Sequence, residues 1–281
     1  MNRDDKLLLD KLEQALAKGE GLRLVYQPKV SCADGSLVRV EALMRWTDAE
    51  LGAVSPTRFV PLAEAHGLID ALTQWALRNA LRQWRSWKAD GLDTAVAVNI
   101  SAVSLEHLDF PDLVERMCRA LDVPIDRLVL ELTEGATQPL IKLMDTLTRF
   151  RIKGVGLAVD DFGTGYSGLI QLRRLPFTEI KIDRQFVTDL PHSRDDAVIV
   201  RAVVELAHGL GLSVTAEGVE TIEQLATLRD FGCDLVQGYL LAHPLEPGDL
   251  VAWASRHKRR WKLLVRPPED PHLRRRIEAH A

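Results

Sequence analysis

Residues 22–46 read LRLVYQPKVSCADGSLVRVEALMRW, and this stretch decides the fold. Two runs rich in β-forming residues, 22–30 and 38–46, are separated by only seven residues, which contain the turn signal Asp34-Gly35. A crossover between parallel strands needs about a dozen residues or more, whereas a short turn can join an antiparallel pair. The first two strands are therefore predicted to form an antiparallel hairpin.

Six further β-rich runs follow, and the links between them are long enough for helices. These runs are 95–100, 128–132, 155–160, 179–183, 213–217 and 235–239. Regular alternation of strands and helices favours a parallel sheet, and eight strands in a chain of 281 residues fit a closed barrel. The predicted fold is an α/β, TIM-like (β/α)8 barrel with one antiparallel strand, contributed by the hairpin.

The charges of the chain are unevenly placed. The formal charge is −4, yet residues 256–281 hold nine Lys or Arg and only three Asp or Glu, so the preceding body is acidic. We expect a domain over 1–255 and a basic tail over 256–281, which is either a solvated end or packs on the barrel through Trp261–Val265. An acidic barrel is not expected to bind DNA.

The cysteines and the hydropathy of the chain indicate its compartment. Cys32, Cys118 and Cys233 are far apart and form no Cys-x-x-Cys pair, which favours a reducing compartment and speaks against a thiolate zinc site. No apolar run approaches the roughly 18 residues of a membrane-spanning helix. We expect a cytoplasmic protein without a membrane span.

Polar residues stand where the predicted strands end. They are Glu41 and Arg45 on the second strand, followed by Asn99, Glu131, Asp160, Asp161, Lys181, Asp183, Glu217, Glu220 and Gln237. The C-terminal ends of barrel strands converge on one pocket. Adjacent carboxylates such as Asp160 and Asp161 repel each other, and burying them without a cation is costly. The pattern therefore predicts a metal site, with two ions, at this end of the barrel.

Each of these residues alone has a plainer explanation, because ion pairs at strand ends are common. Glu41 could pair with Arg45, and Lys181 with Asp183. The glycine-rich segment 163–168 is a weak signal for a nucleotide-binding loop, since no P-loop lysine follows it. Solvated strand ends do not explain the whole set, so the metal site remains the interpretation.

Seven motifs resemble those of the EAL-domain cyclic di-GMP phosphodiesterases, over roughly residues 5–255. The motifs are Glu41-Ala-Leu-Met-Arg45, Val98-Asn99-Ile-Ser, Glu131-Leu-Thr-Glu134, Asp160-Asp161-Phe-Gly-Thr-Gly-Tyr166-Ser167, Lys181-Ile-Asp183, Glu217-Gly-Val-Glu220 and Gln237-Gly-Tyr239. One departure is Gly168, which stands where the family usually has a second serine after the tyrosine.

The resemblance implies hydrolysis of cyclic di-GMP to linear pGpG with two Mg²⁺ or Mn²⁺ ions. We expect Ca²⁺ to inhibit the reaction, because it prefers more oxygens at longer distances than Mg²⁺. The implied metal ligands are Glu41, Asn99, Glu131 and Asp160 for one ion, and Asp160, Asp161 and Glu217 for the other. The implied catalytic residues are Lys181, which would orient or deprotonate the attacking water, together with Glu134, Asp183 and Glu220. The implied substrate contacts are Gln27, Leu43, Arg45 and Gln237.

The resemblance also suggests a homodimer. The alternative to an active enzyme is a non-catalytic cyclic di-GMP receptor, or a protein-binding regulator, of the same fold. Such a protein would keep the barrel and the pocket but would not turn over the nucleotide.

Overall fold

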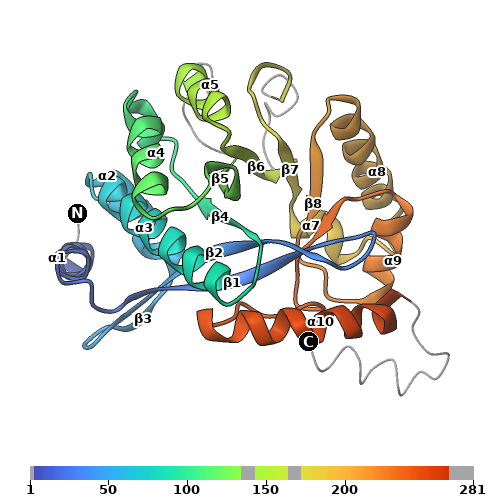
Figure 1. Cartoon of the computed structure of the whole chain (residues 1–281), viewed down its shortest axis with the longest axis horizontal. Coiled ribbons are helices and arrows are strands. Elements are labelled where there is room, and N and C mark those ends of the chain that lie inside the picture. The colour runs from blue at the N-terminus through green and yellow to red at the C-terminus, as the bar shows by residue number, and fades with distance from the viewer. Residues whose placement is uncertain (1–2, 134–142, 164–171, 266–281) are drawn as a thin grey trace.

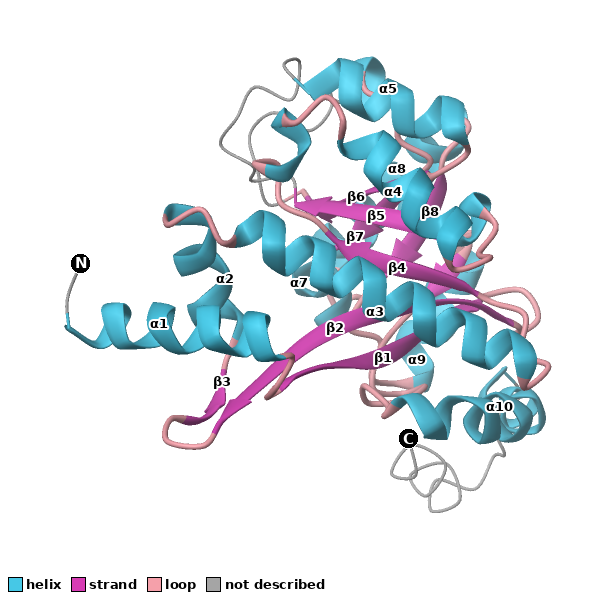
Figure 2. Cartoon of the chain, turned by 60° about the vertical axis from the view of Figure 1, so that its left-hand side comes forward, coloured by secondary structure: helices cyan, strands magenta, loops and turns pink. Residues whose placement is uncertain are grey.

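The computed structural model describes residues 3–133, 143–163 and 172–265. Within these residues the chain forms nine strands, eight of which close into a barrel with helices around its outside (Figures 1 and 2). The strands are β1 (Leu22–Ser31), β2 (Leu37–Asp48), β3 (Gly52–Val54), β4 (Ala95–Asn99), β5 (Leu128–Thr133), β6 (Gly156–Phe162), β7 (Glu179–Ile182), β8 (Ser213–Ala216) and β9 (Leu235–Val236). Around the barrel their order is β1, β9, β8, β7, β6, β5, β4 and β2, and β2 pairs with β1 to close the sheet.

One strand of the barrel is reversed. β1 is antiparallel to both of its neighbours, β2 and β9, whereas the other neighbouring pairs of the barrel are parallel. Between β1 and β2 the chain turns at Gly35, which has a left-handed φ of +70°, and Asp34 accepts hydrogen bonds from the amide and the hydroxyl of Ser36. The predicted barrel with one antiparallel strand is confirmed. The short β3 pairs with β2 outside the barrel and has no counterpart among the predicted strands.

Most of the helices lie around the outside of the barrel (Figures 1 and 2). Those described are α1 (Arg3–Lys18), α2 (Pro56–Ala65), α3 (Ile69–Ala89), α4 (Phe110–Ala120), α5 (Met144–Lys153), α7 (Arg184–Thr188), α8 (Arg194–Gly209), α9 (Ile222–Asp230) and α10 (Leu250–Val265). Three short 3₁₀ turns accompany them, at Ser104–Glu106, Ile125–Arg127 and Pro247–Asp249. None of the described helices has the length and apolar character needed to cross a membrane.

The two faces of the barrel strands carry different side chains. Along β2, Val40 and Ala42 belong to the apolar core, whereas the alternating Arg39 and Glu41 have partners on strands that are not neighbours of β2. Arg39 pairs with Glu179 on β7, and such a contact can form only through the inside of the barrel. The barrel interior is therefore charged, and the apolar core lies between the strands and the helices.

The last described helix, α10, continues past Ser255, the predicted end of the domain. Its buried face includes His257, whose ring stacks on Trp253 with 4.5 Å between the ring centroids. Burial lowers the pKa of His257 to about 4, so this side chain is neutral at pH 7. Further along, Trp261 lies against Gly35, where an added Cβ would approach the indole to 2.2 Å. The helix thus packs on the hairpin that closes the barrel.

We expect a chain that ends at Ser255 to melt at a lower temperature than one that ends at Val265. The shorter chain loses Trp261 and Leu264, which are 4% and 1% exposed. Their burial contributes about 5 kcal/mol to the free energy of unfolding. Thermal unfolding followed by circular dichroism measures the difference, and the chain ending at Val265 is the control. Equal melting temperatures would mean that these residues are a solvated end.

Candidate metal and substrate site

A cavity of about 330 Å³ opens at the C-terminal ends of the parallel strands. Ten of the predicted site residues line it: Gln27, Glu41, Leu43, Asp160, Asp161, Lys181, Asp183, Glu217, Glu220 and Gln237. Arg184, Gly218, Gly238 and Tyr239 complete the lining. Residues from six strands and the segments that follow them thus meet at one place, because a closed barrel brings these ends together.

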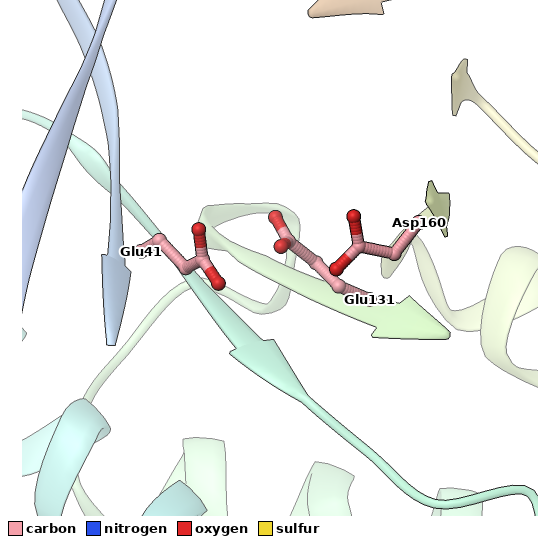
Figure 3. A group of neighbouring side chains, drawn as sticks. All are labelled: Glu41, Glu131 and Asp160. Carbon is pink, nitrogen blue, oxygen red and sulfur yellow. The ribbon is translucent and has the colours of Figure 1, made fainter. Parts of the chain in front are cut away.

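In each of two groups, the carboxylates lie close enough to one another to bind one cation together. The first group is Glu41 on β2, Glu131 on β5 and Asp160 on β6, all buried, and Figure 3 shows their carboxylates turned toward one another. The second group is Asp160, Asp161 and Glu217. In each group the chosen oxygens lie within 4.8 Å of one another, and Asp160 belongs to both. An oxygen-only donor set of this kind fits hard divalent cations such as Mg²⁺ or Mn²⁺.

Lys181 lies at the centre of these carboxylates. Its Nζ is 2.6 Å from Glu131 Oε2, 2.7 Å from Glu217 Oε1 and 2.9 Å from Asp160 Oδ1. Glu41 Oε2 is 3.7 Å away. Burial disfavours the charged amine, but the four carboxylates outweigh this effect and hold the pKa of Lys181 well above its usual value. The side chain is therefore an ammonium that forms ion pairs with both carboxylate groups.

Burial and neighbouring charges shift the pKa of Glu131 and the pKa of Glu217 in opposite directions. Burial would raise the pKa of Glu131, but Lys181 and Lys29 together lower it to about 2. Desolvation raises the pKa of Glu217 to about 8, helped by the charges of Asp160 and Glu41, although Lys181 opposes the shift. The chain thus carries more negative charge here than its own ammonium groups balance, which is the electrostatic setting that favours divalent cations.

Asp161 has an unusual backbone conformation. Its φ is +54°, which is uncommon for a residue other than glycine, and the pairing of β6 with β7 shifts register between Val159 and Phe162. Its amide donates to Asp160 Oδ1 at 2.9 Å. Desolvation and the neighbouring charges of Asp160 and Asp183 raise the pKa of Asp161 to about 6. This bulge lets two consecutive carboxylates line the same cavity, which a regular strand would place on opposite faces.

Amide side chains hold Glu41 in place. Asn99 Nδ2 donates to Glu41 Oε1 at 2.7 Å, and Gln237 Nε2 donates to Glu41 Oε2 at 2.8 Å. Gln237 Nε2 also lies 3.0 Å from Gln27 Oε1, and Gln27 donates to the carbonyl of Ala242 at 3.3 Å. Both oxygens of Glu41 are therefore fixed by hydrogen bonds. The predicted ligand role of Asn99 stays a prediction.

Besides Asn99, three predicted residues are not part of the described cavity lining. Glu131 lies beneath it, fully buried, and reaches the site through its ion pairs with Lys181 and Lys29. Arg45 is half-buried, and its guanidinium donates to the carbonyl of Met44 at 2.8 Å. Glu134 lies outside the described residues, as does Gly168. The predicted roles of Arg45 and Glu134 stay predictions.

The structure adds two residues to the site that the strand-end pattern does not identify. Arg184 is exposed and lines the cavity at the start of α7, where Asp183 caps the helix by accepting from the amide of Gln185 at 2.8 Å. Lys29 is wholly buried in β1 and pairs with Glu131. Its spacing from Gln27 could have identified Lys29. The two residues are two positions apart, and such residues lie on the same face of a strand.

Comparisons with known proteins agree on one family. The sequence profile of the family described as EAL domain matches residues 9–244. Cyclic di-GMP phosphodiesterase PA2567 of Pseudomonas aeruginosa is 42% identical over 250 residues, which cover 89% of this chain and 43% of that protein. Cyclic di-GMP phosphodiesterase NbdA of the same species is 44% identical over 238 residues, or 84% of this chain and 30% of that protein. The chain therefore spans less than half the length of these relatives.

A solved structure shows the same arrangement of the chain. The PaMucR phosphodiesterase in complex with c-di-GMP superimposes with a TM-score of 0.81 at 42% sequence identity, covering 87% of this chain and 99% of that one. Fold, strand-end carboxylates and sequence profile thus point the same way: the chain belongs to the EAL domain family.

Proposed function

We propose that this chain hydrolyses cyclic di-GMP to linear pGpG with two divalent cations, Mg²⁺ or Mn²⁺. The observation that carries the proposal is the pair of oxygen-donor groups that share Asp160 beside a cavity. The names of PA2567 and NbdA and the c-di-GMP bound to PaMucR support the choice of substrate.

Each group of carboxylates would hold one ion. Glu41, Asn99, Glu131 and Asp160 would bind the first, and Asp160, Asp161 and Glu217 the second. Bound there, the two cations would supply an activated water and would stabilise the negative charge that develops on the phosphodiester. The protein contributes a fixed, largely buried set of oxygens, so that little reorganisation accompanies the reaction.

Lys181 is proposed to orient the attacking water. Its ammonium lies within hydrogen-bonding distance of Glu131 and Glu217, one from each proposed ion site, so it faces the space between them. An ammonium group donates hydrogen bonds and takes up no proton. Of the two roles implied for this lysine, orientation therefore fits its surroundings better than deprotonation.

The remaining predicted residues would contact the nucleotide or shape its pocket. Gln27, Leu43 and Gln237 line the cavity and are proposed substrate contacts, together with Arg45, whose guanidinium suits a phosphate. Asp183 and Glu220 also line the cavity and are proposed to complete the catalytic pocket.

The direct test is product formation. The purified chain is incubated with cyclic di-GMP and Mg²⁺, and chromatography is used to look for pGpG, with a chelator-treated sample as the control. We expect pGpG only when the metal is present. A well-folded sample that binds the nucleotide and forms no pGpG with any divalent cation would instead identify a receptor.

Two features of the whole protein are also proposed. The described cysteines Cys32, Cys118 and Cys233 are all free, which fits a reducing compartment and hence a cytoplasmic location. A homodimer is proposed from family resemblance, and light scattering of the purified chain measures it directly.

A further inference from the structure

The side chain of Lys29 ends in an amino group that has no access to solvent. The residue lies in β1 with an exposed fraction of 0%, and it pairs with Glu131 Oε1 through the inside of the barrel. Its Nζ is also 4.0 Å from Glu41 Oε2. A buried ammonium costs several kcal/mol of desolvation unless carboxylates balance it. Lys29 is therefore held in the barrel by two carboxylates that are proposed ligands of the first metal ion.

Lys29 and Lys181 contact different oxygens of the Glu131 carboxylate. Lys29 engages Oε1, while Lys181 lies 2.6 Å from Oε2, so each oxygen of this carboxylate already has a cationic partner. Lys181 reaches carboxylates of both proposed ion sites, whereas the ion pairs of Lys29 within the described residues are with Glu131 and Glu41. A divalent cation bound by Glu131 must share that carboxylate with Lys29 or take its place.

We propose that Lys29 is a positioning residue that acts as a built-in counter-cation of the first metal site. It balances Glu131 and Glu41 in the metal-free barrel, and it lowers the affinity of these carboxylates for a divalent cation because it competes for the same charge. The inference rests on the metal site of the proposed function. Lys29 thereby stabilises the interior of the barrel in the absence of metal, and it limits the affinity of the first site for a divalent cation.

A second, largely buried ion pair provides a control. Arg39 on β2 pairs with Glu179 on β7, and Glu179 also accepts a hydrogen bond from Thr215 at 2.5 Å. None of these three residues belongs to the carboxylate groups that could hold an ion. Replacing Arg39 therefore removes a largely buried cation from the same barrel and leaves the proposed ligands intact.

The experiment compares Lys29→Met, Lys29→Arg and Arg39→Met with the unmodified chain. Calorimetry at pH 8 measures the dissociation constant for Mn²⁺, and thermal unfolding measures the melting temperature without metal. We expect Lys29→Met to bind Mn²⁺ about tenfold tighter or more, because the repulsion between an ammonium and a divalent cation is removed. The same variant should melt at a lower temperature without metal, and Mn²⁺ should raise its melting temperature more than that of the unmodified chain.

The controls separate this effect from loss of stability. Lys29→Arg keeps the charge and should leave the affinity for Mn²⁺ within a few-fold of the unmodified chain. Arg39→Met should lower the melting temperature with no change in the dissociation constant. Should Lys29→Met be unfolded without metal, Lys29→Gln, which keeps a hydrogen-bonding group, takes its place in the titration.

The possible failures are distinguishable. If the unmodified chain binds no Mn²⁺, the proposed metal site is wrong. If the unmodified chain binds Mn²⁺, but folded Lys29→Met binds it equally or more weakly, the metal site stands and the role of Lys29 is wrong. If neither uncharged variant folds even in excess Mn²⁺, Lys29 forms a structural ion pair and the proposal is likewise overturned.

Discussion

Glu41→Gln is expected to lower the turnover of cyclic di-GMP by on the order of a thousandfold or more, because it removes a charged oxygen ligand from a two-ion site. The substitution keeps the size of the side chain and an oxygen that can accept the hydrogen bond from Asn99. It removes the negative charge that lies 4.0 Å from Lys29 and 3.7 Å from Lys181. The rate of pGpG formation at saturating substrate measures the effect.

A loss of folding would give the same low rate, so stability is measured in parallel. Circular dichroism and the melting temperature should show a folded barrel for Glu41→Gln. Glu246→Gln is the matched control, since Glu246 is an exposed glutamate whose ion pair with Arg23 lies outside the cavity lining. Its turnover should match that of the unmodified chain. A folded Glu41→Gln with near-normal turnover would remove Glu41 from the metal site.

Exchange of Mg²⁺ for Ca²⁺ is expected to abolish hydrolysis and preserve binding of cyclic di-GMP. Ca²⁺ takes six to eight oxygens at about 2.3–2.6 Å, whereas Mg²⁺ requires near-octahedral geometry at about 2.0–2.1 Å. The two carboxylate groups (Glu41, Glu131 and Asp160; Asp160, Asp161 and Glu217) offer clustered oxygens that can bind either ion. Binding needs positive charge in an acidic cavity, but the reaction also needs the water and the phosphate at the right separation.

Calorimetry measures nucleotide binding in each metal, and chromatography measures pGpG. Adding Mg²⁺ or Mn²⁺ back to the Ca²⁺-loaded sample should restore hydrolysis, which is the control for irreversible inactivation. Hydrolysis in Ca²⁺ at the Mg²⁺ rate would contradict the geometric argument. A chain that binds the nucleotide in all three metals and hydrolyses it in none would be the receptor described above.

The polar residues at the ends of the predicted strands identify most of the site, because this pattern depends only on residues close together in the sequence. Ten of the predicted residues line the cavity, and the adjacent carboxylates of Asp160 and Asp161 indicate a cation by their position in the sequence alone. The conformation of that pair was not predictable, since the left-handed φ of Asp161 depends on a register shift against β7. Arg184 was missed because it follows a strand end and has no carboxylate or amide that would mark it as a ligand.

The C-terminal end of the domain could also be predicted only in part from the sequence. A change in charge at residue 256 suggested a boundary, yet charge describes only the exposed side of an amphipathic helix. Trp261 and Leu264 lie on the buried side of α10, and the surface that receives Trp261 is a turn at Gly35, far away in the sequence. The composition of the C-terminal segment therefore does not predict the contact between Trp261 and Gly35.

By itself the sequence determined the order and the direction of the strands. The length of the link between the first two strands fixed the reversed strand, and the alternation of apolar and polar residues fixed which ends carry the chemistry. Only the tertiary structure decided the pairing of charges inside the barrel: Lys29 with Glu131, and Arg39 with Glu179, join strands that are not neighbours. The physical reason is that strand periodicity arises between residues close in sequence, whereas partners across a barrel depend on its closure and on the stagger of all eight strands.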